Sequence, residues 1–289
     1  MNPKSLKLRV KNLGVSTKGL HVLRAALGLE GNQPEANRPI LLAIDFENTK
    51  NFMNGFPHSE TGQVGLATLD TRELHTSPPE KLISTNNLIS GSSSYTSMVS
   101  SNVLFGTTAI IKPAEVLQKI QSLIPSDRDI ILVGHGVRVE LGILVTLGFT
   151  FSPRIASIID TCGVTGEVLG SPHYSLRELL KTLGCPHDRL HTAGNDAHFT
   201  LRAALLLVAR GFPDHDHPTI DILRSIAMEP QAHQVRAEAR AATREERKIA
   251  HLNSRKYQSQ FWTDEQKDEL RAQRAAKKAQ AEVDIWNLS

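Results

Sequence analysis

"RPILLAIDFENTKNF", residues 38–52, places a continuous apolar run directly before acidic residues. The apolar stretch 40–44 is typical of a strand that is buried on both faces of a sheet. Asp45 and Glu47 end this strand, and residues two apart in a strand point to the same side. Two neighbouring carboxylates repel each other unless a positive charge lies between them. The stretch therefore predicts a central buried strand with two acids on one face at its end. On its own, such an acid pair is common at strand ends and does not establish a cation site.

Strand-like and helix-like patterns alternate after this stretch, so we predict a mixed α/β sheet flanked by helices. Ser175 and Glu178 form the spacing of a capping box, which marks the start of a helix. Residues 75–102 are rich in Ser, Thr, Asn, Pro and Gly, and we expect a long loop or insertion there. Strands are expected at 63–74, 102–111, 129–136 and 155–161, and helices at 113–124, 137–148, 175–184 and within 190–211.

The charge is distributed unevenly along the chain. The whole sequence carries +3, but residues 1–38 hold seven Lys/Arg against two acids, and residues 230–289 hold twelve against nine. The centre, 39–229, therefore has fourteen basic residues against nineteen acidic ones. An acidic centre is unusual for a plain nucleic-acid-binding protein and fits carboxylates that are clustered around bound cations. Ordinary solvated charge is the alternative.

Several classes of protein are disfavoured by composition. No apolar run of about eighteen residues occurs, which argues against a membrane span. Cys162 and Cys185 stand far apart, as expected of a protein in a reducing compartment. We expect the cytoplasm, with the nucleus or mitochondrion left open. The first acid is Glu30, so a mitochondrial presequence is an alternative to a short helical lead-in.

Further polar residues interrupt apolar patterns later in the chain. Glu140 lies in "VGHGVRVEL" (133–141), and His191 and Asp196 lie in "LHTAGNDAHF" (190–199). An oxygen-lined pocket formed by such acids suits hard cations such as Mg²⁺ or Mn²⁺. His191 and Asp196 are five residues apart, and if both were helical their side chains would point to different sides of the helix. We therefore expect His191 on the loop before the helix.

The combination of motifs is more specific than any one of them. "DFE" at 45–47, "VGHGVRVEL", "IDT" at 159–161, "SLRELLKTLG" at 175–184 and "HTAGNDA" at 191–197 occur together in one order. In this order the chain resembles the DEDDh exonuclease family over about residues 38–212, with a fungal branch as the nearest fit. The resemblance implies a ribonuclease H-like fold and a two-metal exonuclease that acts on the 3′ end of RNA or DNA.

The resemblance also implies a role for each matching residue. His191 corresponds to the general base, and Glu140 stands where the family usually has aspartate. The implied cofactors are two divalent ions, Mg²⁺ or Mn²⁺. The implied metal ligands are Asp45, Glu47, Glu140 and Asp196. The implied substrate-binding residues are Phe46, Asn48, Thr49, His135 and Asp160, although a structural role for His135 is an alternative.

The remaining chain is expected to extend this domain. We predict a basic N-terminal lead at 1–37, the ribonuclease H-like domain at 38–212, and a linker with a charged helical extension at 213–289. Phe261 and Trp262 stand near Lys and Arg, so the extension can bind nucleic acid, a protein partner or its own domain. The oligomeric state stays open. The alternative function is a catalytically impaired nuclease fold that binds RNA or protein.

Overall fold

One mixed sheet forms the centre of the fold. The computed structural model describes residues 9–30, 34–56, 61–229, 248–249 and 262–286. In this described part, six strands follow the order β4-β3-β2-β1-β5-β6. β1, β2 and β3 are antiparallel neighbours, whereas β4 runs parallel to β3, β5 to β1, and β6 to β5. The strands are β1 (Ile40–Glu47), β2 (Gly62–Asp70), β3 (Ile83–Ser90), β4 (Thr107–Ile110), β5 (Ile130–Gly134) and β6 (Ile155–Asp160). The predicted mixed α/β sheet is confirmed.

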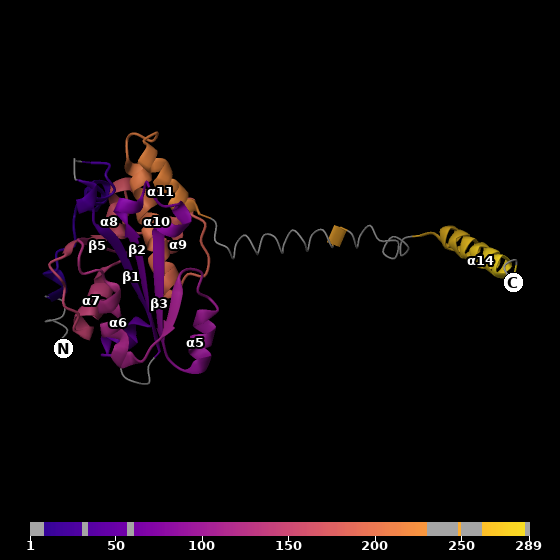
Figure 1. Cartoon of the computed structure of the whole chain (residues 1–289), viewed down its shortest axis with the longest axis horizontal. Helices are drawn as coiled ribbons and strands as arrows, with labels where there is room; N and C mark the ends of the chain where they lie inside the picture. The colour runs from indigo at the N-terminus through magenta and orange to yellow at the C-terminus, as the bar shows by residue number, and fades with distance from the viewer. Residues whose placement is uncertain (1–8, 31–33, 57–60, 230–247, 250–261, 287–289) are drawn as a thin grey trace. The chain divides into compact units, whose positions relative to one another are not determined.

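Helices cover both faces of this sheet (Figure 1). On one face lie α2 (Gly19–Ala26), α8 (Thr161–Leu169), α9 (Leu176–Thr182), α10 (Ala193–Gly211) and α11 (Pro218–Met228). On the other face lie α3 (Thr49–Met53), α6 (Val116–Leu123) and α7 (Arg138–Leu147). The short helices α4 (Pro79–Leu82) and α5 (Ser93–Ser100) flank β3. Short 3₁₀ turns occur at Glu35–Asn37, Thr71–Glu73 and Pro113–Glu115.

Alternate residues of β1 face two different hydrophobic cores. Leu41 and Ala43 belong to the core beneath α10, whereas Leu42 and Ile44 belong to the core beneath α7. Because side chains alternate along a strand, the two acids at the end of β1 continue the series that faces α10. α10 is buried almost throughout its length, since it lies between the sheet and its neighbouring helices. The strand thus directs its acids toward this central helix.

The expectation of a long loop at residues 75–102 is wrong. This segment contains α4, β3 and α5. Its polar side chains are used inside the fold: Thr85 Oγ1 lies 3.0 Å from His198 Nδ1, and Asn87 Nδ2 donates to the carbonyl of Phe105 at 2.9 Å. Tertiary hydrogen bonds engage Thr85 Oγ1 and Asn87 Nδ2, so a strand forms despite a composition typical of loops.

The compact unit extends beyond the expected domain. The chain divides into one unit at 1–230 and a second at 231–289. The first unit therefore includes α11, which lies in the range expected to form the linker, and it buries Ile220 and Leu223 against α10. It also includes part of the expected N-terminal lead, because Val15 pairs with Ile158 of β6. The helix α8 was not expected either.

The second unit contains α14 (Asp264–Trp286), which agrees with the helix expected in the extension. Trp262 precedes this helix and is half-buried, whereas Phe261 lies outside the described residues. A search of the described helices finds none that combines the length and apolar character needed to cross a membrane.

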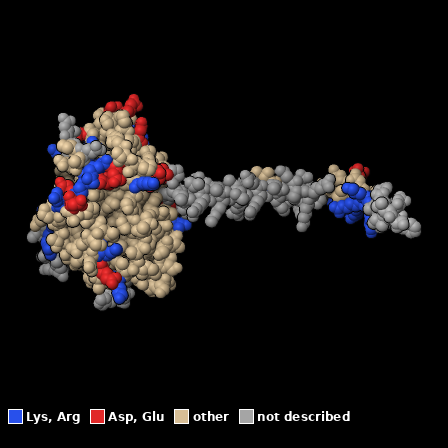
Figure 2. All heavy atoms as spheres, in the orientation of Figure 1, with Lys and Arg blue, Asp and Glu red and all other residues tan. Residues whose placement is uncertain are grey.

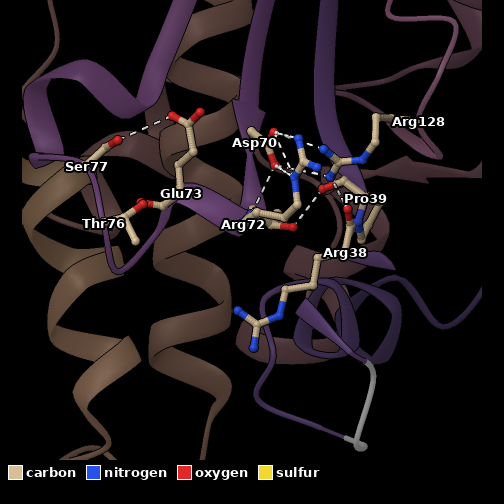
Figure 3. A network of polar contacts seen from close by, with 9 residues as sticks. Arg38, Pro39, Asp70, Arg72, Glu73, Thr76, Ser77 and Arg128 are labelled. Atoms are coloured by element: carbon tan, nitrogen blue, oxygen red, sulfur yellow. Dashed lines mark hydrogen bonds and ion pairs between the residues drawn. The ribbon is translucent and has the colours of Figure 1, made fainter. Parts of the chain in front are cut away.

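An ion-pair network closes the end of the sheet opposite the acids of β1 (Figure 3). Asp70, at the end of β2, accepts hydrogen bonds from Arg72 and Arg128, and Arg128 also donates to the carbonyl of Arg38. Burial alone would raise the pKa of Asp70, but these hydrogen bonds outweigh it and lower the pKa to about 2. The network fixes the start of β1 to the end of β2.

Replacing Asp70 by asparagine should lower the free energy of unfolding by about 1–3 kcal/mol, because Arg128 would keep a partly buried charge without its anion. Urea unfolding at neutral pH measures this loss. Asp129→Asn is the matched control, since its pair with Arg154 is 52% and 53% exposed and should contribute less than about 1 kcal/mol. The contribution of Asp70 should be present at neutral pH and disappear as the pH falls from about 4 through about 2. Equal losses in both variants would contradict this role.

Candidate active site

Two of the expected metal ligands end β1 on the same face. Asp45 pairs in register with Gly65 of β2, and Glu47 pairs with Gln63. This placement follows from the two-residue period of a strand. The sequence expectation that both carboxylates point to one side agrees with the geometry.

Two glycines allow α10 to approach the strands that carry these acids. A Cβ atom on Gly65 would lie 2.0 Å from the carbonyl oxygen of Ala193, at the start of α10. A Cβ atom on Gly194 would lie 1.6 Å from Oδ1 of Asn87 in β3. Neither distance is possible for real atoms, so only glycine permits this contact. The close approach brings the first turn of α10, which carries Asp196, to the end of β1.

The acids interact strongly once they are assembled. Burial raises the pKa of Asp45 well above its usual value, and the charges of Asp196, Glu140 and Glu47 raise it further. Burial, reinforced by the charge of Asp160, raises the pKa of Glu140 to about 7. The pKa of Asp196 also rises to about 7, chiefly through burial, with the backbone hydrogen bond from His191 opposing and Glu47 reinforcing the shift. The four carboxylates therefore form one electrostatic cluster.

Three of these carboxylates each leave one oxygen unsatisfied. Oδ2 of Asp45, Oε2 of Glu140 and Oδ1 of Asp196 are buried without a hydrogen-bond partner in the described part of the chain. A buried acceptor without a partner is costly, and a buried charge even more so. A divalent cation satisfies oxygens of this kind and removes their mutual repulsion. The residues present therefore fit a metal centre.

His191 stands at the open side of the acid cluster. Its side chain is 81% exposed, and its Nδ1 lies 3.6 Å from Oε1 of Glu47. Its backbone N–H donates to Oδ2 of Asp196 at 2.8 Å. The residue has a φ of 69°, a left-handed conformation that is uncommon for a side-chain-bearing residue, and it precedes α10 as expected. Glu47, His191 and Asp196 each offer a ligand atom within 4.8 Å of the others, close enough for one cation.

The expected substrate-binding residues take different positions. Phe46 is only 3% exposed and packs against Phe52 in the core beneath α7, because strand alternation turns it away from the acids. Its side chain therefore does not face the site. Asn48, directly after Glu47, has a φ of 63° and precedes α3, whose first residue is Thr49. Both are at least partly exposed beside the acids.

His135 and Asp160 make hydrogen bonds that connect the end of β5 with the end of β6 and the chain before α9. His135 Nε2 donates to the carbonyl of Tyr174 at 2.9 Å, and Nδ1 lies 2.8 Å from the hydroxyl of Thr161. Burial lowers the pKa of His135. Oδ1 of Asp160 accepts from the backbone N–H groups of Gly136 and Cys162 at 2.9 and 3.0 Å. Both ring nitrogens of His135 are thus engaged within the protein, which agrees with its structural alternative.

Sequence reasoning missed two polar residues next to the acids. Gln63 is 8% exposed, and its Oε1 accepts from the backbone N–H of Ala193 at 3.2 Å. Tyr95 of α5 places its hydroxyl 3.2 Å from Nε2 of the same glutamine. The position of Gln63 follows only from the register with Glu47, which the sequence does not give. Tyr95 did have a signal, since it is an isolated aromatic residue in a serine-rich segment.

A comparison with family models agrees with this geometry. Residues 40–207 match the model of the DEDDh C-terminal domain, described as DNA polymerase III subunit epsilon-like. The chain belongs to the DEDDh exonuclease family. The matched range contains every acid of the cluster and His191, and it spans the mixed sheet from β1 to most of α10. A search of curated proteins found no match.

Family membership confirms the resemblance drawn from the motifs and the ribonuclease H-like fold. It also supports a nuclease, and therefore nucleic acid as the class of substrate. DEDDh nucleases use divalent metals, in agreement with the acidic cluster around Glu47, His191 and Asp196. The assignment to a fungal branch stays a prediction.

Proposed function

We propose that this DEDDh protein is a metal-dependent 3′–5′ exonuclease that hydrolyses the terminal phosphodiester bond of RNA or DNA. The observation that carries the proposal is the set of buried, unpartnered oxygens on Asp45, Glu140 and Asp196 beside an exposed histidine. Such an arrangement is unfavourable for a protein that only binds a partner, because it stores repulsion without a structural benefit.

The four carboxylates of Asp45, Glu47, Glu140 and Asp196 would hold two divalent cations, Mg²⁺ or Mn²⁺. When bound, such ions supply an acidified water and neutralise the charge that develops on the phosphate. Glu140 keeps its carboxylate within the cluster despite its extra methylene, since it is 6% exposed and its charge acts on Asp45. This position supports an active enzyme over the alternative of a catalytically impaired binding module.

His191 would act as the general base. Imidazole is the side chain best suited to accept a proton near neutral pH, and the high exposure of this ring leaves it accessible to substrate and water. Glu47 lies near Nδ1 and can stabilise the imidazolium that forms. The backbone N–H of His191 donates a hydrogen bond to Asp196. One segment would therefore position both the proton acceptor and a metal ligand.

Figure 2 shows one face of the compact unit, and no broad basic patch stands out on that face. Basic and acidic side chains are interspersed there, and much of this face of the compact unit carries neither. We propose that the 3′ end is bound mainly at the acid cluster and its immediate surroundings, where the side chain of His191 is 81% exposed. The charged helix α14 remains a candidate contact for nucleic acid or a protein partner. Both cysteines are free, which is compatible with a reducing compartment such as the cytoplasm.

Oligonucleotides labelled at the 5′ end should be shortened stepwise from the 3′ end in Mg²⁺ or Mn²⁺ and should stay intact with chelator. RNA and DNA are assayed in parallel, and a circular substrate tests for endonuclease activity. Replacing His191 by asparagine should lower kcat by about 10²–10⁴-fold, because the proton acceptor is lost while the four carboxylates remain. His215→Asn, in an exposed loop before α11, is the matched control.

Several outcomes would contradict the proposal. Binding of oligonucleotides without any shortening under all metal conditions would favour the binding module. Cleavage of the circular substrate would favour an endonuclease. An equal loss in the His191 and His215 variants would remove the base assignment.

A further inference from the structure

The turn between β3 and α5 positions Tyr95 beside the acid cluster. It belongs to α5, and its ring packs over Gly91, which follows β3. A Cβ atom on Gly91 would lie 2.7 Å from Cδ1 of Tyr95 and 3.0 Å from Cγ2 of Thr61. Any other residue at this position would therefore press on the ring. The φ of 148° at Gly91 also disfavours a side chain there.

The hydroxyl of Tyr95 receives two hydrogen bonds. Nδ2 of Asn48 donates to it at 3.0 Å, and Nε2 of Gln63 donates to it at 3.2 Å. The orientation of Gln63 is fixed, because its Oε1 accepts from the backbone N–H of Ala193. The amide of Asn48 is oriented by a second bond from Nδ2 to Thr61 Oγ1 at 3.1 Å. Both amides therefore present N–H groups to the phenol.

This leaves the phenolic hydrogen unused. A tyrosine hydroxyl has one donor and two acceptor lone pairs, and here both lone pairs are taken. No acceptor for the remaining hydrogen is found among the residues that the structure describes. Burial, reinforced by the charge of Glu47, raises the pKa of Tyr95, so the hydroxyl stays protonated and can donate.

An unused acceptor belongs to the same network. The amide nitrogen of Asn48 donates hydrogen bonds to Thr61 and Tyr95. The Oδ1 atom of Asn48 makes no hydrogen bond in the described part of the chain. Asn48 directly follows Glu47, and Gln63 is the register partner of Glu47. A donor from Tyr95 and an acceptor from Asn48 are therefore offered next to a metal-ligand candidate.

We propose that Tyr95, together with Asn48, binds a sugar hydroxyl of the 3′-terminal nucleotide. A hydroxyl both donates and accepts, so it matches this pair of groups. A phosphate oxygen only accepts, and it would be repelled by Asn48 Oδ1 and by Glu47. A sugar hydroxyl is also present on every nucleotide end, whatever the base. The inference rests on the proposed function because it requires a nucleic-acid end at this site.

The test removes the proposed hydrogen bond in two ways, by changing Tyr95 in the protein and by changing the terminal sugar of the oligonucleotide. Tyr95→Phe is compared with the wild type on oligonucleotides that end in a ribose, a 2′-deoxyribose or a 3′-deoxyribose. On the substrate that carries the bound hydroxyl, Tyr95→Phe should lower kcat/KM about tenfold, as expected for one lost hydrogen bond. On the substrate that lacks this hydroxyl, the variant and the wild type should be equal. The 2′- and 3′-deoxy arms identify which hydroxyl is bound.

Tyr174→Phe is the matched control, because it makes the same chemical change where the hydroxyl has no hydrogen bond among the described residues. Equal losses of Tyr95→Phe on all three ends would show a purely structural role and overturn the inference. Thermal unfolding checks the fold of each variant. If Tyr95→Phe does not fold, Gly91→Ala displaces the ring while it keeps the hydroxyl, and the same dependence on the terminal sugar is expected.

A binding measurement separates this inference from the proposed function. Fluorescence anisotropy compares the affinities for the three ends with no need for cleavage. If the wild type shortens no oligonucleotide but discriminates the ends, and Tyr95→Phe loses that discrimination, the exonuclease proposal fails and the hydroxyl contact stands. A wild type that binds all three ends equally, and also processes them equally, overturns the hydroxyl contact.

Discussion

Replacing Asp45 by asparagine should abolish metal-dependent hydrolysis and, at the same time, stabilise the metal-free protein. Asp45 lies within the cluster, where burial raises its pKa and the charges of three other carboxylates raise it further. Without one metal ligand, activity should fall about a thousandfold or more, since several kcal/mol of metal stabilisation are lost. Without metal, the substitution removes one repelling charge, which should stabilise the fold by about 1 kcal/mol and raise Tm by about 2–4 °C.

The two effects have opposite signs, and this makes the experiment specific. Activity is measured on the labelled oligonucleotide, and Tm is measured in chelator and again in Mn²⁺. Mn²⁺ should raise Tm of the wild type and have a much smaller effect on the variant. Asp221→Asn, whose side chain is 71% exposed, should change neither quantity. A metal-free Asp45→Asn protein that is less stable than the wild type would show that the carboxylate has a structural partner and would remove the metal-site assignment.

The stability of the metal-free protein should fall as the pH rises from about 4 to about 7. The pKa values of Glu140 and Asp196 are both about 7 in the folded protein, above their ordinary values of 4.5 and 3.8. Within this window the folded state retains protons that the unfolded chain has released, so each unit of pH favours unfolding. The shift of Glu140 alone corresponds to roughly 3 kcal/mol. Most mesophilic proteins lose little stability in this range.

Thermal unfolding at about pH 5 and about pH 8, with chelator and with Mg²⁺, measures the effect. In chelator, Tm should be lower at the higher pH. With Mg²⁺ the difference should shrink, because metal binding requires deprotonated ligands and therefore strengthens as the pH rises. Glu140→Gln should flatten the dependence in chelator. A metal-free protein that becomes more stable over this range would contradict the assembled acid cluster.

Much of the fold follows from local patterns in the sequence. The apolar run before Asp45 predicts β1, and the two-residue period predicts that Asp45 and Glu47 share a face. The capping box at Ser175 and Glu178 is present as expected, with Ser175 Oγ accepting from the backbone of Glu178. The position of His191 before α10 also follows, because helical spacing excludes the alternative. These features depend on neighbours within a few residues.

Other features depend on contacts between distant segments. β3 forms although residues 83–90 include Ser, Thr and Asn, because its polar groups bond to α10 and to the chain before β4. The burial of Phe46 against Phe52 requires knowledge of both sheet faces. The hydrogen bonds of Tyr95 require the register of β2 with β1. Such pairings combine residues that are far apart in the chain, so composition and periodicity do not reveal them.

The close approach of α10 to β2 and β3, which Gly65 and Gly194 permit, has a consequence for when the proposed activity arises during synthesis. The first acids of the cluster are made early, but the helix that completes it is among the last parts of the compact unit to leave the ribosome. A nascent chain that ends before residue 191 lacks both the imidazole of His191 and the carboxylate of Asp196. The groups that the proposed exonuclease needs are therefore complete only when translation of this unit is nearly finished, and the proposed activity cannot arise before then.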